Sequence, residues 1–222
     1  MSNLRKYWAV TKVNFKTNRL AYLVTGFCLL AGIANAVVQI AFHLSDSTVS
    51  PSNYLYLLCV LMPIFVASGN YTRFRNIGVR KNIFLWGSAI NYIILSVFVS
   101  LVCVAEFYLF DKNFSVYNLV NVFNWDTNIF TAFFSSFSFL LLFQVIIHTL
   151  TFMQTKWYGW VADLVIIAII SIFTPIAPLR QVEIFFFDLI IFVKPAIIQI
   201  AVCLGLSVAF YLTNSFYLKN RN

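Results

Sequence analysis

Long apolar stretches separated by short polar ones run through the whole chain. Six of these stretches contain about 20 residues, the length that an α-helix needs to cross the hydrocarbon core of a bilayer. They cover residues 20–44, 54–71, 83–110, 129–153, 160–179 and 195–217. The pattern therefore predicts an all-α polytopic membrane protein with six transmembrane helices.

The composition indicates the same class of protein. Of the 222 residues, 61% are hydrophobic and only 10% are charged, which leaves too few polar side chains to cover a soluble globule. Cys28, Cys59, Cys103 and Cys203 all lie inside apolar stretches, with no Cys-x-x-Cys pair and no Cys/His spacing. They predict neither a disulfide framework nor a metal site.

Basic residues are divided unevenly between the two sides that six crossings define. Twelve of the 15 Lys and Arg residues fall in the N-terminal segment, the second and fourth connections and the C-terminal tail, and no acidic residue does. Because Lys and Arg accumulate on the cytoplasmic side, we expect both termini in the cytoplasm. The net charge of +8 comes from these juxtamembrane clusters, and attraction to anionic membrane lipids is enough to explain them. Nucleic acid is therefore not an expected partner.

No internal repeat or low-complexity linker divides the chain, so residues 1–222 are expected to form a single transmembrane domain. Within it we expect an inner interfacial helix over residues 1–19, a six-span body over residues 20–217 and a cytoplasmic tail over residues 218–222.

Residues 2–18 have the pattern of a basic amphipathic helix. Arg5 and Lys12 fall on one helical stripe, with Trp8 and Phe15 beside it. Such a helix lies in the headgroup layer, here that of the inner leaflet. The alternative is an ordinary basic tail next to the first span.

Two other segments do not simply connect spans. Residues 114–125 carry apolar side chains at helical spacing, which predicts an outer interfacial helix, with a flexible loop as the alternative. Residues 182–193 are apolar but too short to cross, and they lie between Pro178 and Pro195. They predict a re-entrant or outer helix, and the alternative is one kinked helix over residues 182–217.

The common catalytic motifs are absent from the sequence. There is no Gly-x-x-x-x-Gly-Lys-Ser/Thr loop, so any use of ATP needs another polypeptide. A His-Glu-x-x-His helix, a Gly-x-Ser-x-Gly elbow and paired carboxylates within one span are also missing. The sequence therefore does not predict an enzyme.

Ionisable residues inside a membrane are functional candidates. His148 and Asp163 flank the short fourth connection at similar depths of roughly 6–9 Å, by helical rise. We expect a hydrogen bond between them that fixes this hairpin, and the alternative is a proton-linked switch. Glu106 lies near the outer end of the third span, where it indicates an interfacial carboxylate.

The second connection is the densest polar cluster in the chain. It reads Phe74-Arg-Asn-Ile-Gly78-Val-Arg80-Lys81 and leads through Asn-Ile into Phe-Leu-Trp-Gly87. This run resembles the loop and third-span entry of type-2 ABC exporter permeases. The six-span layout, the basic N-terminal helix and the broken segment before the last span are similar to the same family. The alternative is that the basic residues here only set the orientation of the chain.

The resemblance implies a permease subunit that forms a homodimer or heterodimer and pairs with separate ABC ATP-binding subunits. ATP and Mg would then be bound by the partner, with no cofactor and no catalytic residue in this chain. The family's coupling contacts, carried onto this sequence, fall on Arg73, Phe74, Arg75, Asn76, Ile77, Gly78, Val79 and Arg80, with Trp8, Lys12 and Phe15 nearby. The expected location is a bacterial plasma membrane.

The 25 phenylalanines favour a hydrophobic or amphipathic cargo such as a peptide, lipid or antibiotic. Two other functions fit the same pattern. One is the substrate-binding six-span subunit of an ATP-dependent vitamin uptake system, and the other is a membrane scaffold that transports nothing.

Overall fold

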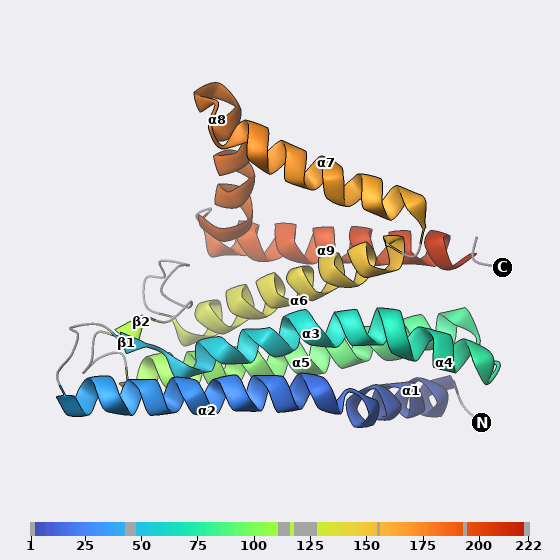
Figure 1. Cartoon of the computed structure of the whole chain (residues 1–222), viewed down its shortest axis with the longest axis horizontal. Helices are drawn as coiled ribbons and strands as arrows, with labels where there is room; N and C mark the ends of the chain where they lie inside the picture. Colours follow the sequence, from blue (N-terminus) through green and yellow to red (C-terminus); the bar gives the residue numbers. More distant parts are fainter. Residues whose placement is uncertain are drawn as a thin grey trace.

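The described part of the protein is built from helices, apart from one pair of two-residue strands (Figure 1). The computed structural model describes residues 3–42, 48–110, 116–117, 128–154, 156–192 and 195–219. The elements in chain order are α1 (Asn3–Thr17), α2 (Arg19–Phe42), β1 (Thr48–Val49), the 3₁₀ helix η1 (Pro51–Leu55), α3 (Tyr56–Phe65), the π-helical turn η2 (Val66–Asn70), α4 (Tyr71–Asn76), α5 (Lys81–Phe110), β2 (Val116–Tyr117), α6 (Ile129–Met153), α7 (Trp157–Phe173), α8 (Ala177–Phe187), the π-helical turn η4 (Asp188–Phe192) and α9 (Ala196–Lys219).

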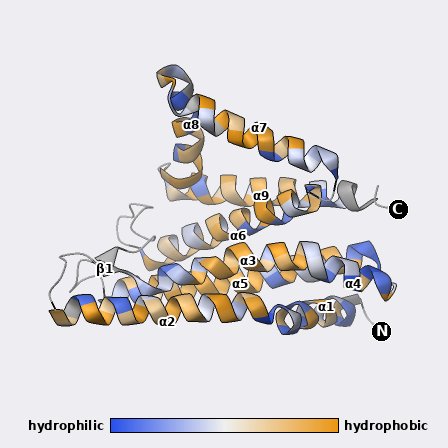
Figure 2. Ribbon diagram, in the orientation of Figure 1, coloured by the Kyte–Doolittle hydropathy of each residue, from blue (hydrophilic) through white to orange (hydrophobic). Residues whose placement is uncertain are grey.

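Five helical stretches among the described residues are long and apolar enough to cross a membrane. They are Arg19–Gln39, Pro51–Asn76, Lys81–Leu109, Ile129–Met153 and Ala196–Ser215. Apolar residues follow these helices over most of their length (Figure 2), and many of their large apolar side chains are exposed on the outside. The chain is membrane-embedded, because only a lipid environment suits so much exposed apolar surface.

The remaining predicted span, residues 160–179, is shorter than expected. Helix α7 begins at Trp157 and ends at Phe173 after 17 residues. It ends there because the residue before Pro175 is driven away from the helical conformation. In Figure 1, α7 leads the chain back from the end of the molecule that holds α1 and α4 toward the opposite end.

The segment between α7 and α9 is a separate helical piece. Helix α8 runs into η4, which ends at Phe192, and α9 begins at Ala196. The chain therefore does not form one continuous helix over residues 182–217. In Figure 1 this piece stands across the direction of α7 and α9.

Helix α6 lies at the centre of the bundle and packs against α3, α5, α7 and α9, while α1 packs along the start of α5. One buried apolar cluster includes Leu58, Met62 and Val99, and a second includes Phe84 and Phe152. The second cluster joins the start of α5 to the end of α6. It therefore supports the end of the molecule where α1 and α4 lie.

The opposite end is organised around Glu106. Its Oε2 atom accepts hydrogen bonds from the Ser50 hydroxyl at 2.6 Å and from the Ser52 backbone N–H at 2.9 Å. This carboxylate thus ties the end of α5 to the start of η1.

The predicted outer helix over residues 114–125 falls mostly outside the described residues. Val116 and Tyr117 are described, and they form β2, which pairs in parallel with Thr48 and Val49 of β1. A helix at these two residues was the wrong expectation, because the pairing with β1 extends the backbone.

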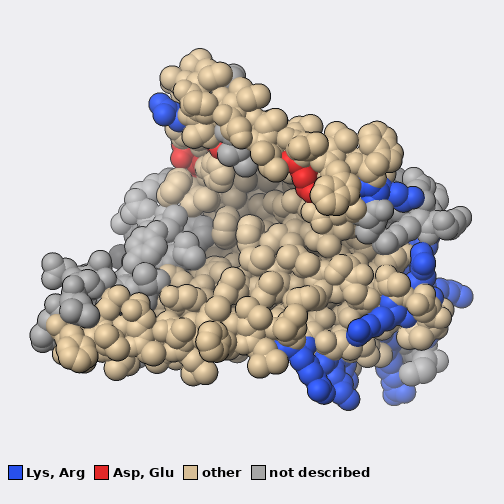
Figure 3. Space-filling model, viewed as in Figure 1, with Lys and Arg blue, Asp and Glu red and all other residues tan. Residues whose placement is uncertain are grey.

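Lys and Arg side chains gather at the end of the molecule that holds α1 and α4 (Figure 3). The acidic side chains visible in the same view lie beside α7 and α8. The folded chain therefore keeps most of the basic side chains seen in this view at one end, although one basic group lies beside α8.

Candidate functional site

The candidate site is the corner where α4 ends and α5 begins, together with α1. Helix α4 ends at Asn76, and Gly78 follows with φ of 76°. The Gly78 N–H bonds to the Arg75 carbonyl and the Val79 N–H bonds to the Phe74 carbonyl, both at 3.0 Å. This pair of bonds is a Schellman motif, in which a glycine in the left-handed region ends a helix. The corner is therefore a fixed turn.

Aromatic side chains attach this corner to the rest of the bundle. The ring of Phe74 lies 5.7 Å from that of Phe84, and Tyr71 contacts Phe84 at 5.2 Å and Phe152 at 5.3 Å, centroid to centroid. Tyr71 and Phe74 belong to α4, Phe84 to α5 and Phe152 to the end of α6. A displacement of the corner would therefore move both α5 and α6.

Helix α1 is held to the bundle by a buried polar network centred on Asn70. The Asn70 Nδ2 atom donates to Oδ1 of Asn14 at 3.0 Å and to Oδ1 of Asn18 at 3.2 Å. The Thr17 hydroxyl donates to Asn70 Oδ1 at 3.1 Å. Asn70 ends the π-helical turn η2, a kind of irregularity that is common at functional sites.

A second attachment joins α1 to α5. The Thr11 hydroxyl donates to the Gly87 carbonyl at 2.9 Å. A Cβ atom at Gly87 would lie 2.6 Å from Cβ of Val10, so only glycine allows the two helices to approach this closely. Helix α1 is thus a fixed part of the folded domain.

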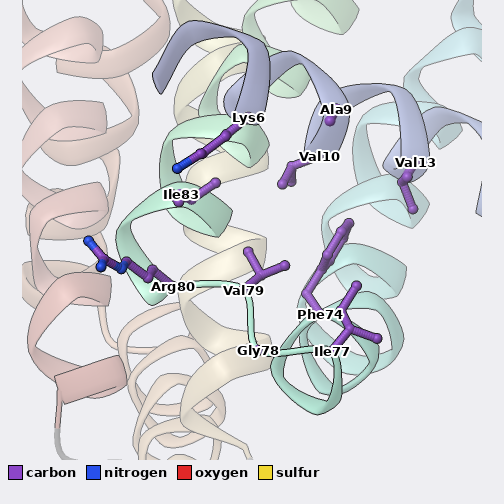
Figure 4. Close-up of a pocket in the computed structure, with 10 residues that line it drawn as sticks. All are labelled: Lys6, Ala9, Val10, Val13, Phe74, Ile77, Gly78, Val79, Arg80 and Ile83. Atoms are coloured by element: carbon purple, nitrogen blue, oxygen red, sulfur yellow. The ribbon is translucent and has the colours of Figure 1, made fainter. Parts of the chain in front are cut away.

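A groove of about 500 Å³ separates α1 from the corner (Figure 4). Its apolar wall includes Val10, Phe74 and Val79, and Lys6 and Arg80 also line it. Figure 4 shows the nitrogen ends of Lys6 and Arg80 at the same end of the groove. The groove combines an apolar body with a basic end.

The structure places most of the predicted coupling residues on the surface. Arg73, Arg75, Asn76, Gly78 and Arg80 are exposed. Ile77 lies beside Gly78 with 74% of its surface exposed, while Phe74 is buried and Val79 is half-buried. Residues 73–76 belong to α4, and the helix stops at Asn76 because Gly78 turns the chain.

The predicted residues of α1 have different surroundings. Trp8 and Lys12 are exposed, and Phe15 is half-buried against the core. Sequence reasoning missed Thr11 and Asn14, which form the buried contacts. Their spacing of three residues places them on one helical face, but which face of α1 packs against the bundle depends on the tertiary structure.

The expected hydrogen bond between His148 and Asp163 does not form. The Tyr92 hydroxyl lies 2.5 Å from Nδ1 of His148, and no described residue forms a hydrogen bond with Nε2 of the same ring. The Asp163 carboxylate accepts from Gln154 at 3.0 Å instead. The expectation was wrong because α6 turns His148 toward α5, whereas Asp163 lies on α7. Depth alone does not say which way two side chains face.

Helices α5 and α6 share a second buried polar contact one turn away. The Gln144 Nε2 atom donates to the Ser96 hydroxyl at 2.6 Å. Ser96 and Gln144 each lie four residues from a member of the Tyr92–His148 pair, so the two contacts form a seam between the helices. Polar contacts of this kind hold transmembrane helices together.

Among the described residues, no three of His, Cys, Asp and Glu lie close enough together to hold a metal ion. The four cysteines are free thiols. Comparison of the chain with protein-family models, with curated proteins and with solved structures finds no match.

Proposed function

We propose that this chain is a transmembrane permease subunit of an ATP-driven ABC exporter, with ATP hydrolysis on a separate partner subunit. The observation that carries the proposal is the exposed corner at residues 73–80, which a fixed turn and an aromatic cluster connect to α5 and α6. A corner of this kind suits the transfer of movement from a partner into membrane helices.

The exposed chemistry of the corner favours a protein partner. Ile77 is 74% exposed and is close in the sequence to the exposed Arg75 and Arg80. A large exposed apolar side chain in a basic turn suits a partner surface with an apolar depression and acidic residues around it. Helix α1 lies across the groove from the corner, and its Lys6 and Ala9 line that groove.

The mechanism follows from how the corner is attached. Closure of the ATP-binding subunits on ATP would press on Ile77, and the aromatic contacts of Phe74 and Phe84 would carry the displacement into α5 and α6. A partner shifts such an equilibrium only by the difference in its affinity for the two states. The permease, paired with an identical or related second copy, would then open a path outward for a hydrophobic or amphipathic substrate.

The deciding experiment is purification of the tagged chain from its native membranes in mild detergent, with mass identification of the bound chains. We expect to recover a chain with a P-loop whose ATPase activity rises when both are reconstituted in liposomes. Recovery of such a P-loop chain without stimulation of its ATPase activity would point to a scaffold. A small molecule retained tightly by the isolated subunit would favour the uptake function.

A charge-reversal variant tests the docking surface itself. Replacing Arg73 and Arg75 by Glu should remove the ATP-binding subunit from the purified complex. Lys156→Glu is the matched control, because Lys156 is an exposed basic residue that follows α6 outside the corner. Retention of the subunit by the Arg73/Arg75 variant would contradict the assignment of the corner.

A further inference from the structure

A second hollow in the molecule is an apolar crevice of about 190 Å³ between α5, α6 and α9. Trp86, Ala89 and Ile93 of α5 line one side, and Val208 and Leu212 of α9 line the other. The Tyr211 hydroxyl of α9 donates a hydrogen bond to the Leu85 carbonyl, near the start of α5. The crevice lies in the half of these helices nearer the basic end of the molecule.

The crevice faces the surrounding membrane. Trp86, Val208 and Leu212 are each at least 60% exposed, and Ile93 is 44% exposed. All four belong to segments that are long and apolar enough to span the bilayer. Lipid is therefore the medium at the mouth of the crevice.

The polar groups in the crevice wall already have partners inside the protein. The Tyr92 hydroxyl lies against His148, the Ser207 hydroxyl donates to the Cys203 carbonyl, and the Tyr211 hydroxyl donates to the Leu85 carbonyl. None of these hydroxyls needs a hydrogen bond from a ligand. The occupant that suits the crevice is therefore a hydrocarbon chain.

The volume limits the size of this occupant. An engineered apolar cavity of about 150 Å³ holds a single benzene molecule. A crevice of about 190 Å³ therefore takes part of one acyl chain. It is too small for a whole phospholipid, whose headgroup must lie outside it.

The inner end of the crevice lies near the start of α5, where basic residues occur in the sequence. Asn82, Trp86, Ala89 and Ile93 form one stripe of α5, because they are separated by four, three and four residues. Asn82 is exposed and lies about 6 Å from Trp86 along the helix axis. Arg80 and Lys81 immediately precede it, and tryptophan is typical of the level where headgroups begin.

We propose that the crevice holds one acyl chain of an anionic phospholipid of the inner leaflet, with its phosphate at Lys81 and Asn82 and with Arg80 nearby. The acyl chain itself gives little preference for the crevice over the bilayer, because bulk lipid is as apolar as the crevice wall. The headgroup sets the selectivity, at about fivefold for each basic residue near the surface. This inference does not depend on the proposed transport function.

The test uses the full chain in nanodiscs that contain phosphatidylglycerol and phosphatidylcholine. Either lipid is supplied in trace amounts with a photoactivatable diazirine on one acyl chain, and the labelled peptides are mapped by mass spectrometry. We expect the phosphatidylglycerol probe to label residues 86–93 and 208–212 at least fivefold more than the phosphatidylcholine probe. Equal labelling by the two probes would overturn the proposal.

Two variants separate the headgroup contact from the crevice. Lys81→Gln should lower the preference for phosphatidylglycerol about fivefold, whereas Lys16→Gln on α1 should leave it unchanged. Ala89→Phe should fill the crevice and abolish its labelling, while Leu101→Phe, at an exposed position of α5 outside it, should not.

The remaining outcomes also decide the question. Unchanged labelling in Ala89→Phe would show that the lipid lies elsewhere. Protection of the crevice from both probes, with crosslinks between copies at Val208, would show that a second copy of the chain covers it. The comparison of the two lipid probes on the wild-type protein tests the proposal by itself, so a poorly folded variant would not leave it undecided.

Discussion

The Tyr92 hydroxyl and Nδ1 of His148 lie 2.5 Å apart in the buried interior of the molecule. This contact joins α5 to α6, and Phe152 and Tyr211 surround the imidazole, with centroids 4.5 Å and 6.0 Å from that of His148. In the described residues, His148 thus connects three helices, α5, α6 and α9, with no role for Asp163.

The first prediction concerns this pair. Tyr92→Phe should lower the free energy of unfolding by about 1–3 kcal/mol, because it leaves the buried imidazole without its partner. The measurement is SDS-induced unfolding in mixed micelles. A double-mutant cycle of Tyr92→Phe with His148→Leu should show a coupling energy of about 0.5–3 kcal/mol. The matched cycle of Asp163→Asn with His148→Leu should show none, and a coupling there would contradict the geometry.

The second prediction concerns the network that holds α1. Asn70→Leu should destabilise the protein by several kcal/mol, since the two buried hydrogen bonds to Asn14 and Asn18 are lost at about 1–3 kcal/mol each when partners stay unpaired, together with the half-buried one from Thr17. Gly69→Ala is the control, because its Cβ atom would meet nothing within 4 Å. Limited proteolysis should also show release of α1 in Asn70→Leu alone. Equal stability of the two variants would show that the network does not hold α1.

The third prediction concerns the contact between α1 and α5. Gly87→Ala should destabilise the protein by about 1–3 kcal/mol through overpacking, because the new methyl group would lie 2.6 Å from Val10. Gly205→Ala in α9 has open space around its Cβ atom, and it should stabilise the helix by about 0.5–1 kcal/mol. Thermal unfolding of the two variants provides the comparison. The same sign of effect for both would contradict the packing described for α1.

The fourth prediction concerns the opposite end of the molecule. Glu106→Ala should lower stability by about 1.5–3 kcal/mol, the range for hydrogen bonds to a charged group, because Ser50 and Ser52 lose their acceptor. Glu106→Gln keeps one acceptor oxygen and should lower stability by less than Glu106→Ala does. Asp188→Ala removes an exposed carboxylate and serves as the control in the same unfolding assay. If Glu106→Ala matched this control, the carboxylate would have no structural role.

Several helices could be predicted from the sequence because the bilayer requires a minimum apolar length. The stretch at 129–153 coincides with α6, and the stretch at 83–110 lies within α5. The span predicted at 160–179 was too long at its C-terminal end, because the apolar sequence continues past Pro175 whereas the helix does not. The polar connection at 73–80 was recognised as a candidate site, but its Schellman turn depends on the φ angle of Gly78, which composition does not reveal.

The sequence by itself determined that the chain lies in a membrane, where most of its long helices run and which end carries the positive charge, since apolar length and Lys/Arg placement are local properties. Only the tertiary structure decided that His148 faces Tyr92, that Asn70 holds α1 and that α5 and α9 leave a crevice between them. These relationships depend on the rotation of each helix about its own axis. That rotation is set by packing between segments distant in the sequence, as the separation of 56 residues between Tyr92 and His148 illustrates.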